Sequence, residues 1–301
     1  MKKLLLILLC LPMIGFGQFT MIPDANFEQK LINLGYDNGA INGSVYTAMI
    51  NTITSLDVEY SNISDLTGIE DFTALTYLNC NSNQLTSLDV SQNTALTYLY
   101  CYSNQLTSLD VSQNTALIDL NCHINQITSL DVSANTALIN LYCLLNQLTS
   151  LDVSGATALT TLWCWDNQLT SLDVSQNTAL YRLNCNSNQL TSLDVSQNTA
   201  LTYLYCNSNQ LTSLDVRNGN NTNMVYFDSE SNPSLSCINV DDFQYSLFNW
   251  TYIDTQHYFS NNCSPSAIEE NSTNKELLKV TDLLGRETKG TKNEVLFYIY
   301  D

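Results

Sequence analysis

A 21-residue unit is repeated without insertion through the middle of this chain. Its first copy, LTYLNCNSNQLTSLDVSQNTA, begins at Leu75. Near copies begin at Leu96, Leu117, Leu138, Leu159, Leu180 and Leu201. A constant period of this length predicts a solenoid, in which each unit forms one coil and packs mainly against its neighbours. A diverged unit precedes the array from Ile53 and a degraded one follows over residues 224–240, so we expect about nine coils with atypical ends.

Apolar and polar residues alternate in both halves of each unit. In the first copy Leu78 and Cys80 belong to one half, and Leu88 and Val90 to the other. This alternation predicts two short strands with one buried face each. No long stretch inside a unit has helical spacing, and Thr, Val and Tyr are frequent, so the return side of each coil should be extended. The expected fold class is a mainly β solenoid.

The repeat pattern LxxLxCxxNxLxxLDVSxNTA resembles the leucine-rich-repeat superfamily, in particular its nested class of secreted bacterial proteins. The flanking text IPDANFEQKLINLGYD and DLTGIEDFTALTYLNC resembles the N-terminal cap of such proteins from the Bacteroidetes. The match covers residues 53–240. It implies a curved solenoid with a parallel sheet on the concave face and an extended or irregular convex side.

The first residues have the pattern of a secretory signal peptide. Two lysines precede an apolar run from Leu4 to Leu11, and small residues precede Gln18. No later stretch reaches the roughly 18 apolar residues that a spanning helix needs. We therefore expect a monomer that is secreted or held at the outer cell surface, without a transmembrane segment.

The segment between the leader and the repeats should form a small helical cap. Phe27, Leu31 and Leu34 fall on one face of a helix over residues 24–34, which would cover the first coil. Asp37 and Gly39 match only a fragment of a calcium-binding loop, and the other carboxylates of such a loop are missing. We expect no metal here.

The tail from residue 274 onward changes character, since lysine and arginine return. KELLKVTDLLGRETKG and EVLFYIYD predict a few strands and resemble a truncated C-terminal sorting domain of the type IX secretion system. The expected organisation is a signal peptide, an N-terminal cap, the repeat solenoid, a C-terminal cap and a partial sorting domain. Their ranges are 1–17, 18–52, 53–240, 241–265 and 266–301.

The chain is strongly acidic, with a formal net charge of −19 at pH 7. Between residues 31 and 216 the single lysine or arginine is Arg182. Nucleic acid is therefore excluded as a partner, because a phosphate backbone is bound by clusters of basic side chains. The acidity is explained either by solubility outside the cell or by a cationic partner.

One column of cysteines runs through the repeats. Its members are Cys80, Cys101, Cys122, Cys143, Cys164, Cys185 and Cys206. Since the alternation turns them inward, we expect small buried side chains that stay reduced. A single file of thiols on parallel strands cannot surround a zinc ion, and we expect no metal and no cofactor. Cys237 and Cys263 lie outside the column, and in an exported protein we expect them to form a disulfide bond.

Two polar columns accompany the cysteines. The asparagine column should form the coil corners by bonding backbone groups, and consists of Asn83, Asn104, Asn125, Asn146, Asn167, Asn188 and Asn209. The aspartate column should point outward, and consists of Asp89, Asp110, Asp131, Asp152, Asp173, Asp194 and Asp215. Either neighbouring hydroxyls and amides stabilise these carboxylates, or they form a weak calcium-binding stripe.

Differences between the repeats are concentrated on the outward positions of the first strand, the third, fifth and seventh residues of each unit. Most of the tyrosines of the array and two tryptophans occur there. Tyr, Trp and Arg anchor interfaces, and the patch is extended by Ile124 and Leu145. The expected ligand-binding residues are Tyr98, Tyr100, Tyr102, His123, Tyr142, Leu144, Trp163, Trp165, Arg182, Tyr203 and Tyr205. The alternative is that these rings only stack on one another as cross-strand pairs.

The sequence favours binding over catalysis. His123 and His257 are its two histidines, and GxSxG, HExxH and phosphate-cradling glycine loops are missing. Cys122 faces inward and His123 outward, which excludes a Cys–His pair. We expect a surface or secreted protein that recognises a protein or glycan on its concave aromatic face. The alternative is a structural spacer or adhesin stalk without a specific ligand.

Overall fold

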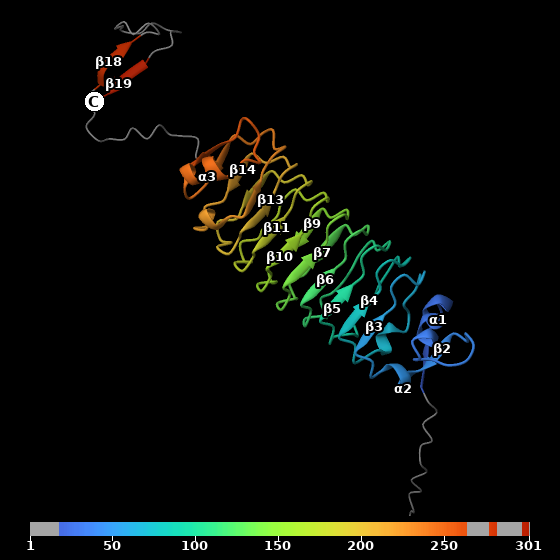
Figure 1. Cartoon of the computed structure of the whole chain (residues 1–301). Coiled ribbons are helices and arrows are strands. Elements are labelled where there is room, and N and C mark those ends of the chain that lie inside the picture. Colours follow the sequence, from blue (N-terminus) through green and yellow to red (C-terminus); the bar gives the residue numbers. More distant parts are fainter. Residues whose placement is uncertain (1–17, 264–276, 282–296, 301) are drawn as a thin grey trace, which may run out of the picture. The chain divides into compact units, whose positions relative to one another are not determined.

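The computed structural model describes residues 18–263, 277–281 and 297–300. The chain divides into two compact units, Met1–Asn262 and Cys263–Asp301. The described part of the first unit is a stack of coils with a short cap at each end (Figure 1). Within the described residues, no helix is both long and apolar enough to cross a membrane. The predicted signal peptide lies outside the described residues.

A nine-stranded parallel sheet runs through the whole stack, with one strand from each coil. Its order is β15-β13-β11-β10-β8-β6-β5-β4-β3. The bounds are β3 (Ser55–Asp57), β4 (Tyr77–Asn79), β5 (Tyr98–Tyr100), β6 (Asp119–Asn121), β8 (Asn140–Tyr142), β10 (Thr161–Trp163), β11 (Arg182–Asn184), β13 (Tyr203–Tyr205) and β15 (Tyr226–Asp228). Equivalent residues of successive repeats pair in register, for example Leu78 with Leu99 and Leu99 with Leu120. The mainly β leucine-rich-repeat solenoid is thereby confirmed.

The return side of the coils is extended, as predicted, but only part of it forms strands. β7 (Ser129–Asp131) pairs with β9 (Ser150–Asp152). A four-stranded sheet contains β12 (Ser192–Asp194), β14 (Ser213–Asp215), β16 (Cys237–Asn239) and β17 (Tyr258–Ser260). In the units from Leu75, Leu96 and Leu159 the expected second strand is absent from the described structure. The inward leucines of these units, Leu88, Leu109 and Leu172, are nevertheless at most 9% exposed. The alternation of buried and exposed side chains therefore persists, because burial of an apolar side chain does not require its backbone to pair with a neighbouring strand.

The cysteine column lies in the core between the two sides of the coil. All seven side chains are free thiols with no exposed surface. Burial raises the pKa of Cys80, Cys122 and Cys185 to about 12 and that of the other four well above the usual value of 9.0. The thiols are therefore protonated and pack as small hydrophobic groups, as predicted.

The predicted asparagine column ties each coil to the one before it. In Asn104 the Nδ2 group donates to the carbonyl oxygens of Cys80 and Cys101, at 3.0 and 3.1 Å, and Oδ1 accepts from the amide of Leu85 at 3.0 Å. Asn125, Asn167, Asn188 and Asn209 repeat this pattern. One asparagine side chain thus forms hydrogen bonds with three backbone groups at a corner, where the chain turns and these groups cannot pair with a neighbouring strand.

A second asparagine ladder, which the sequence analysis did not single out, lies at the opposite corner. Its members are fully buried and are Asn93, Asn114, Asn135, Asn177 and Asn198. Asn114 Nδ2, for example, donates to the carbonyl oxygens of Val90 and Asn93, both at 2.9 Å. The SxN spacing in five of the seven repeats was the signal for this ladder.

Gly155 and Ala156 interrupt the second ladder. Because Ala156 replaces an asparagine, this unit has no side-chain amide at the second corner that could reach back to the preceding coil. The backbone of Gly155 instead approaches that coil so closely that a Cβ atom would lie 1.7 Å from the carbonyl oxygen of Ser133. Glycine is required at this position because the backbones meet there.

The N-terminal cap contains β1 (Phe19–Met21), α1 (Ala25–Asn33), β2 (Ser44–Tyr46) and α2 (Thr47–Ile50), followed by the 3-10 turn η1 (Ile69–Asp71). Asp24 caps α1 through Oδ1, which accepts from the amides of Asn26 and Phe27. Phe27 and Leu31 are fully buried, which confirms the helix over the first coil. Leu34 is 39% exposed, and its expected place on the buried face is wrong because the helix ends before it.

The C-terminal cap contains a short helix that was not predicted. The 3-10 turn η2 (Asn221–Asn223) precedes it, and α3 (Phe243–Asn249) is capped by Asp242. Trp250 stacks on Phe227 with 4.2 Å between ring centroids and closes the core. In the second unit β18 (Leu277–Thr281) and β19 (Phe297–Tyr300) form an antiparallel pair. The rest of the predicted sorting domain lies outside the described residues.

Candidate functional site

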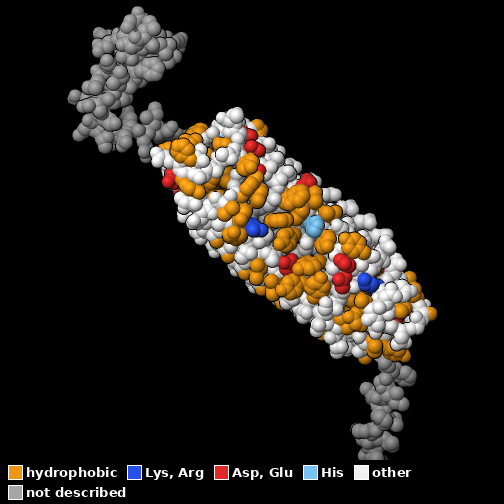
Figure 2. Space-filling view, in the orientation of Figure 1, with side chains coloured by type: hydrophobic (Ala, Val, Ile, Leu, Met, Phe, Trp, Pro, Cys, Tyr) orange, Lys and Arg blue, Asp and Glu red, His pale blue; other side chains and the backbone are white. Residues whose placement is uncertain are grey.

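We call the outward surface of the nine-stranded sheet the long-sheet face. It consists of the third, fifth and seventh residues of each repeat, which the parallel register stacks in three columns. In the space-filling view, hydrophobic side chains, with tyrosine among them, gather in patches along the coils (Figure 2). Few acidic, basic or histidine side chains lie between them in that view.

Three tyrosines form the first aromatic group on this face. The ring centroid of Tyr77 lies 6.3 Å from that of Tyr98 and 5.6 Å from that of Tyr100, the second pair being edge to face. Tyr98 remains 38% exposed. Burial, and then the charge of Asp119, raises the pKa of Tyr100 to about 12. Burial also raises the pKa of Tyr77, so the phenols of Tyr77 and Tyr100 are neutral polar groups.

The second group contains the histidine. His123 stacks on Tyr102, and its Nδ1 atom contacts Asn121 Oδ1. Burial lowers the pKa of His123, so the imidazole is neutral at pH 7. Next to it, Tyr142 meets Trp163 edge to face with 5.3 Å between ring centroids. The structure thus brings four of the predicted residues together in two pairs, from four successive coils.

The third group surrounds the basic side chain. The guanidinium of Arg182 lies 4.6 Å from the ring centroid of Tyr203 and 5.6 Å from that of Tyr181. Tyr181 was missed because it falls one residue before the expected column, yet it is 39% exposed. Farther along, Tyr205 stacks on Tyr226 with 4.4 Å between centroids.

The stack continues into the C-terminal cap, where Tyr226 lies 5.4 Å from Tyr252 between ring centroids. Sequence reasoning missed these two residues because the period is lost in the degraded last unit. The insertion near residue 219 removes the spacing that marks the outward positions.

Leu144 is not available on the surface, although it was predicted to line the site. It is 7% exposed, since it lies in one column between the larger side chains of His123 and Trp165. Asn79 and Asn81 were also expected outward and are 6% and 1% exposed, held beneath their neighbours by hydrogen bonds to Glu59. Trp163 and Trp165 are half-buried.

Two hydrophobic side chains at the edge of the face stand on strained backbone. Ile124 and Leu145 have φ of 53°, in the left-handed region that a β-branched residue such as isoleucine avoids. Four other repeats have serine at the same corner, with φ between 52° and 55°. Ile124 is nevertheless 45% exposed, so burial does not compensate for its conformation.

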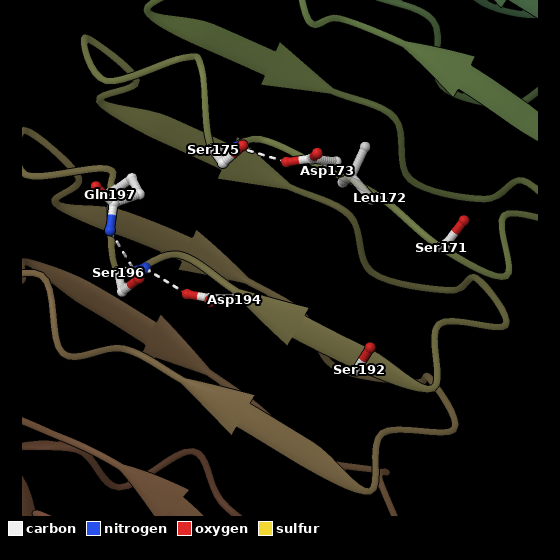
Figure 3. A pocket seen from close by; sticks show the side chains of 8 residues that line it. All are labelled: Ser171, Leu172, Asp173, Ser175, Ser192, Asp194, Ser196 and Gln197. Atoms are coloured by element: carbon white, nitrogen blue, oxygen red, sulfur yellow. Dashed lines mark hydrogen bonds between the residues drawn. The ribbon is translucent and has the colours of Figure 1, made fainter.

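The aspartate column lies on the return side and is stabilised locally. Asp173 and Asp194 each accept from the backbone amide of the serine two residues later, at 2.8 Å (Figure 3). Hydrogen bonds from the side chain and then from the backbone amide of Ser175 hold the pKa of the Asp173 carboxyl below its usual value. Serines and aspartates of neighbouring coils line shallow grooves there, in which Ser171 and Ser192 also point outward (Figure 3). This local bonding favours the hydroxyl- and amide-bonded row over a calcium stripe.

Cys237 and Cys263 are each in the disulfide-bonded state. Their pairing with each other stays a prediction. Among the described residues, no group of three or more His, Cys, Asp or Glu side chains is arranged to hold a metal ion.

Comparison with known proteins decides the family. No protein-family model matches the sequence. Internalin C2 from Listeria monocytogenes is 22% identical over 73% of this chain and 94% of its own, with a TM-score of 0.57. A leucine-rich-repeat protein of Leptospira interrogans is 23% identical over 71% of this chain and 55% of its own, with a TM-score of 0.54. Both share the fold.

The functional domain of InlJ from Listeria monocytogenes, which includes a cysteine ladder, is 31% identical over 74% of this chain and 68% of that domain. Its TM-score is 0.36, and the sequence identity carries the relationship. The chain is a leucine-rich-repeat protein related to the internalins. This leucine-rich-repeat protein is also 41% identical over 71 residues to full-length Internalin J of Listeria monocytogenes serotype 4b (strain F2365), of which the match spans 8%.

Proposed function

We propose that this leucine-rich-repeat protein is an exported binding protein, released or displayed at the outer cell surface, that holds a protein or glycan on the long-sheet face. The observation that carries the proposal is the aromatic surface just described, where the repeats differ from one another. Rings that stack in cross-strand pairs still leave edges and faces open, and such amphipathic groups anchor interfaces. Mutual stacking therefore positions the rings in advance and does not compete with binding.

The strained corner supports the same conclusion. Serine would serve at Ile124 and Leu145, as it does in four other repeats, and would cost less backbone strain. Ile124 is exposed and Leu145 is half-buried, and apolar side chains held at the surface in an unfavourable conformation beside an aromatic cluster are typical of a recognition surface.

Binding is favoured over catalysis because the ionisable groups of the face lack complementary partners. His123 is neutral and contacts Asn121, while Cys122 beside it is fully buried with a strongly raised pKa. Neither a nucleophile with its base nor an acid with a distinct base is assembled there.

The test is ligand retention by the purified protein on glycan and protein arrays. A variant with Tyr142→Ala, Trp163→Ala and Trp165→Ala should weaken retention at least about tenfold, as expected when central aromatic anchors are removed. The matched control removes three exposed apolar side chains from the C-terminal end, namely Phe243, Phe248 and Tyr258. Equal retention by both variants would favour the structural spacer instead.

Export is tested separately. The mature protein should be recovered from the culture medium or the outer surface with an N-terminus near Gln18. A mature chain found in the cytoplasm would refute this part of the proposal and would leave the binding surface untouched.

A further inference from the structure

Carboxylates stand at both ends of the long-sheet face. Asp57 and Glu59 lie on the first coil, and Asp228 and Glu230 lie on the ninth strand and the residues after it. Within the described residues the ion pairs are Arg217 with Asp215 and His257 with Asp254. The four carboxylates of the two ends have no described lysine or arginine against them.

Neutral amides hold the carboxylates of the first end in place. Glu59 Oε2 accepts from Asn79 Nδ2 at 3.1 Å and from Asn81 Nδ2 at 3.0 Å, and Asp57 Oδ2 accepts from Asn79 at 3.4 Å. These bonds orient the carboxylates and leave their charge uncompensated. The side-chain oxygen of Asn81, which is 1% exposed, has no partner at all, so this end also contains an unused acceptor.

A further carboxylate lies within the aromatic part of the face. Asp119 Oδ2 accepts from Asn140 Nδ2 at 2.9 Å, and burial raises the pKa of the Asp119 carboxyl. Its charge acts on the neighbouring rings of Tyr100 and Tyr142. The one arginine of the face, Arg182, already lies over tyrosine rings. The described face therefore presents uncompensated negative charge interleaved with aromatic rings.

We propose that the ligand of this face is a polypeptide segment with lysine or arginine side chains, extended along the stack of strands. The inference rests on the proposed function and names its ligand. Rings and carboxylates together bind ammonium and guanidinium groups, through the ring faces and through charge-assisted hydrogen bonds. A neutral sugar chain would stack on the rings and could donate hydroxyl hydrogen bonds to the carboxylates, but it would leave the negative charge of both ends uncompensated.

The spacing of the carboxylates sets the length of the segment. Eight strand intervals separate β3 from β15. At about 4.8 Å each they span roughly 38 Å, which matches about 12 residues of extended chain. Arg182 repels a positive charge, so the ligand should carry a neutral or acidic residue opposite it.

The experiment measures binding of a fluorescein-labelled peptide of about 12 residues, with lysines at both ends and glycine and serine between them. The full chain should bind it and should bind a matched glutamate peptide at least about tenfold more weakly. The test variant neutralises the two ends by Asp57→Asn, Glu59→Gln, Asp228→Asn and Glu230→Gln. It should bind the lysine peptide at least about tenfold more weakly than the natural protein does.

The control variant loses the same charge on the return side, by Asp89→Asn, Asp110→Asn, Asp152→Asn and Asp173→Asn. Its affinity should change less than about twofold, because those carboxylates face away from the ligand. Equal losses in the two variants would mean that the peptide responds only to the overall acidity, and would overturn the inference. So would equal affinity for the lysine and glutamate peptides.

A neutral oligosaccharide, maltoheptaose, separates this inference from the proposed function. If it binds, survives neutralisation of the ends and is lost in the variant with Tyr142→Ala, Trp163→Ala and Trp165→Ala, the ligand is a glycan. The proposed function would then stand and the cationic ligand would be wrong. If the aromatic variant changes the binding of neither probe nor of any array ligand, the proposed function itself fails.

Discussion

The imidazole of His123 lies flat against the phenol ring of Tyr102, with 4.5 Å between the ring centroids and 9° between their planes. The two rings come from neighbouring coils at the same position of the repeat. Because burial lowers the pKa of His123, the stacked form is the neutral one. Because the imidazole can be protonated, the pH dependence of the stability of the protein reports on how this ring is packed.

Stability should fall as the pH drops below about 6.5, and part of this loss should come from His123. The unfolded chain takes up the imidazole proton near pH 6.5, whereas the folded chain does so only at lower pH, so the unfolded state binds more protons between the two pKa values. His123→Asn introduces the residue found at this position as Asn186 and Asn207. Urea unfolding midpoints at pH 7.5 and pH 5 should differ less in the variant. Parallel pH dependence in the two proteins would contradict the burial of the imidazole.

The seven column cysteines should resist alkylation in the folded protein. Burial holds their thiols protonated, with a pKa of about 12 for Cys80, Cys122 and Cys185, and the thiolate is the reactive form. Iodoacetamide at pH 8 should label none of them without denaturant and all of them in urea, as intact mass shows. Rapid labelling of any column thiol in the native protein would refute the buried column.

Gly155→Ala should destabilise the protein by about 2–3 kcal/mol, because the new Cβ would meet the carbonyl oxygen of Ser133 and the backbone must move. Ala134→Gln is the matched control, since glutamine stands at the same position in four of the other repeats, as Gln92, Gln113, Gln176 and Gln197. It should change stability by less than about 0.5 kcal/mol. Chemical unfolding of the two variants makes the comparison, and equal effects would show that the contact is not selective for glycine.

Ile124→Ser and Leu145→Ser should stabilise the fold while weakening ligand retention. Serine adopts the left-handed corner at lower cost, and a gain of about 1 kcal/mol per site is expected. Retention on the array should fall severalfold because two apolar contacts of the recognition surface are lost. Ser103→Ile is the reverse control, which should destabilise the fold by a similar amount. A gain in stability without any loss of retention would remove the corner from the proposed site.

The repeat period predicts which residues form the long sheet, and the tripeptide Ser-Leu-Asp explains why the period is needed. Ser55–Asp57 lies in the long sheet, whereas the same tripeptide at Ser129–Asp131 lies on the return side. Local propensity is identical in the two segments. Only the position within the stack decides which side each segment occupies, because the partner strands differ.

The exposure of side chains on the long-sheet face was harder to predict. Alternation along a strand indicates to which side a side chain points, but it does not indicate how far neighbouring side chains cover it. Leu144 points outward by register, yet its larger neighbours cover it, and Asn81 is drawn in by its bonds to Glu59 and Asn79. The carboxylates at the ends were overlooked because they belong to atypical units outside the periodic array. Asp242 before α3 was the available signal for the missed helix, since an aspartate often caps a first turn.

The corner asparagines bond within their own coil and to the coil before it, and this short range makes the array extensible. Adding one 21-residue unit would lengthen the recognition surface by one strand interval and would disturb no distant contact. Gain or loss of whole units can therefore change the length of the long-sheet face and adjust it to ligands of different size.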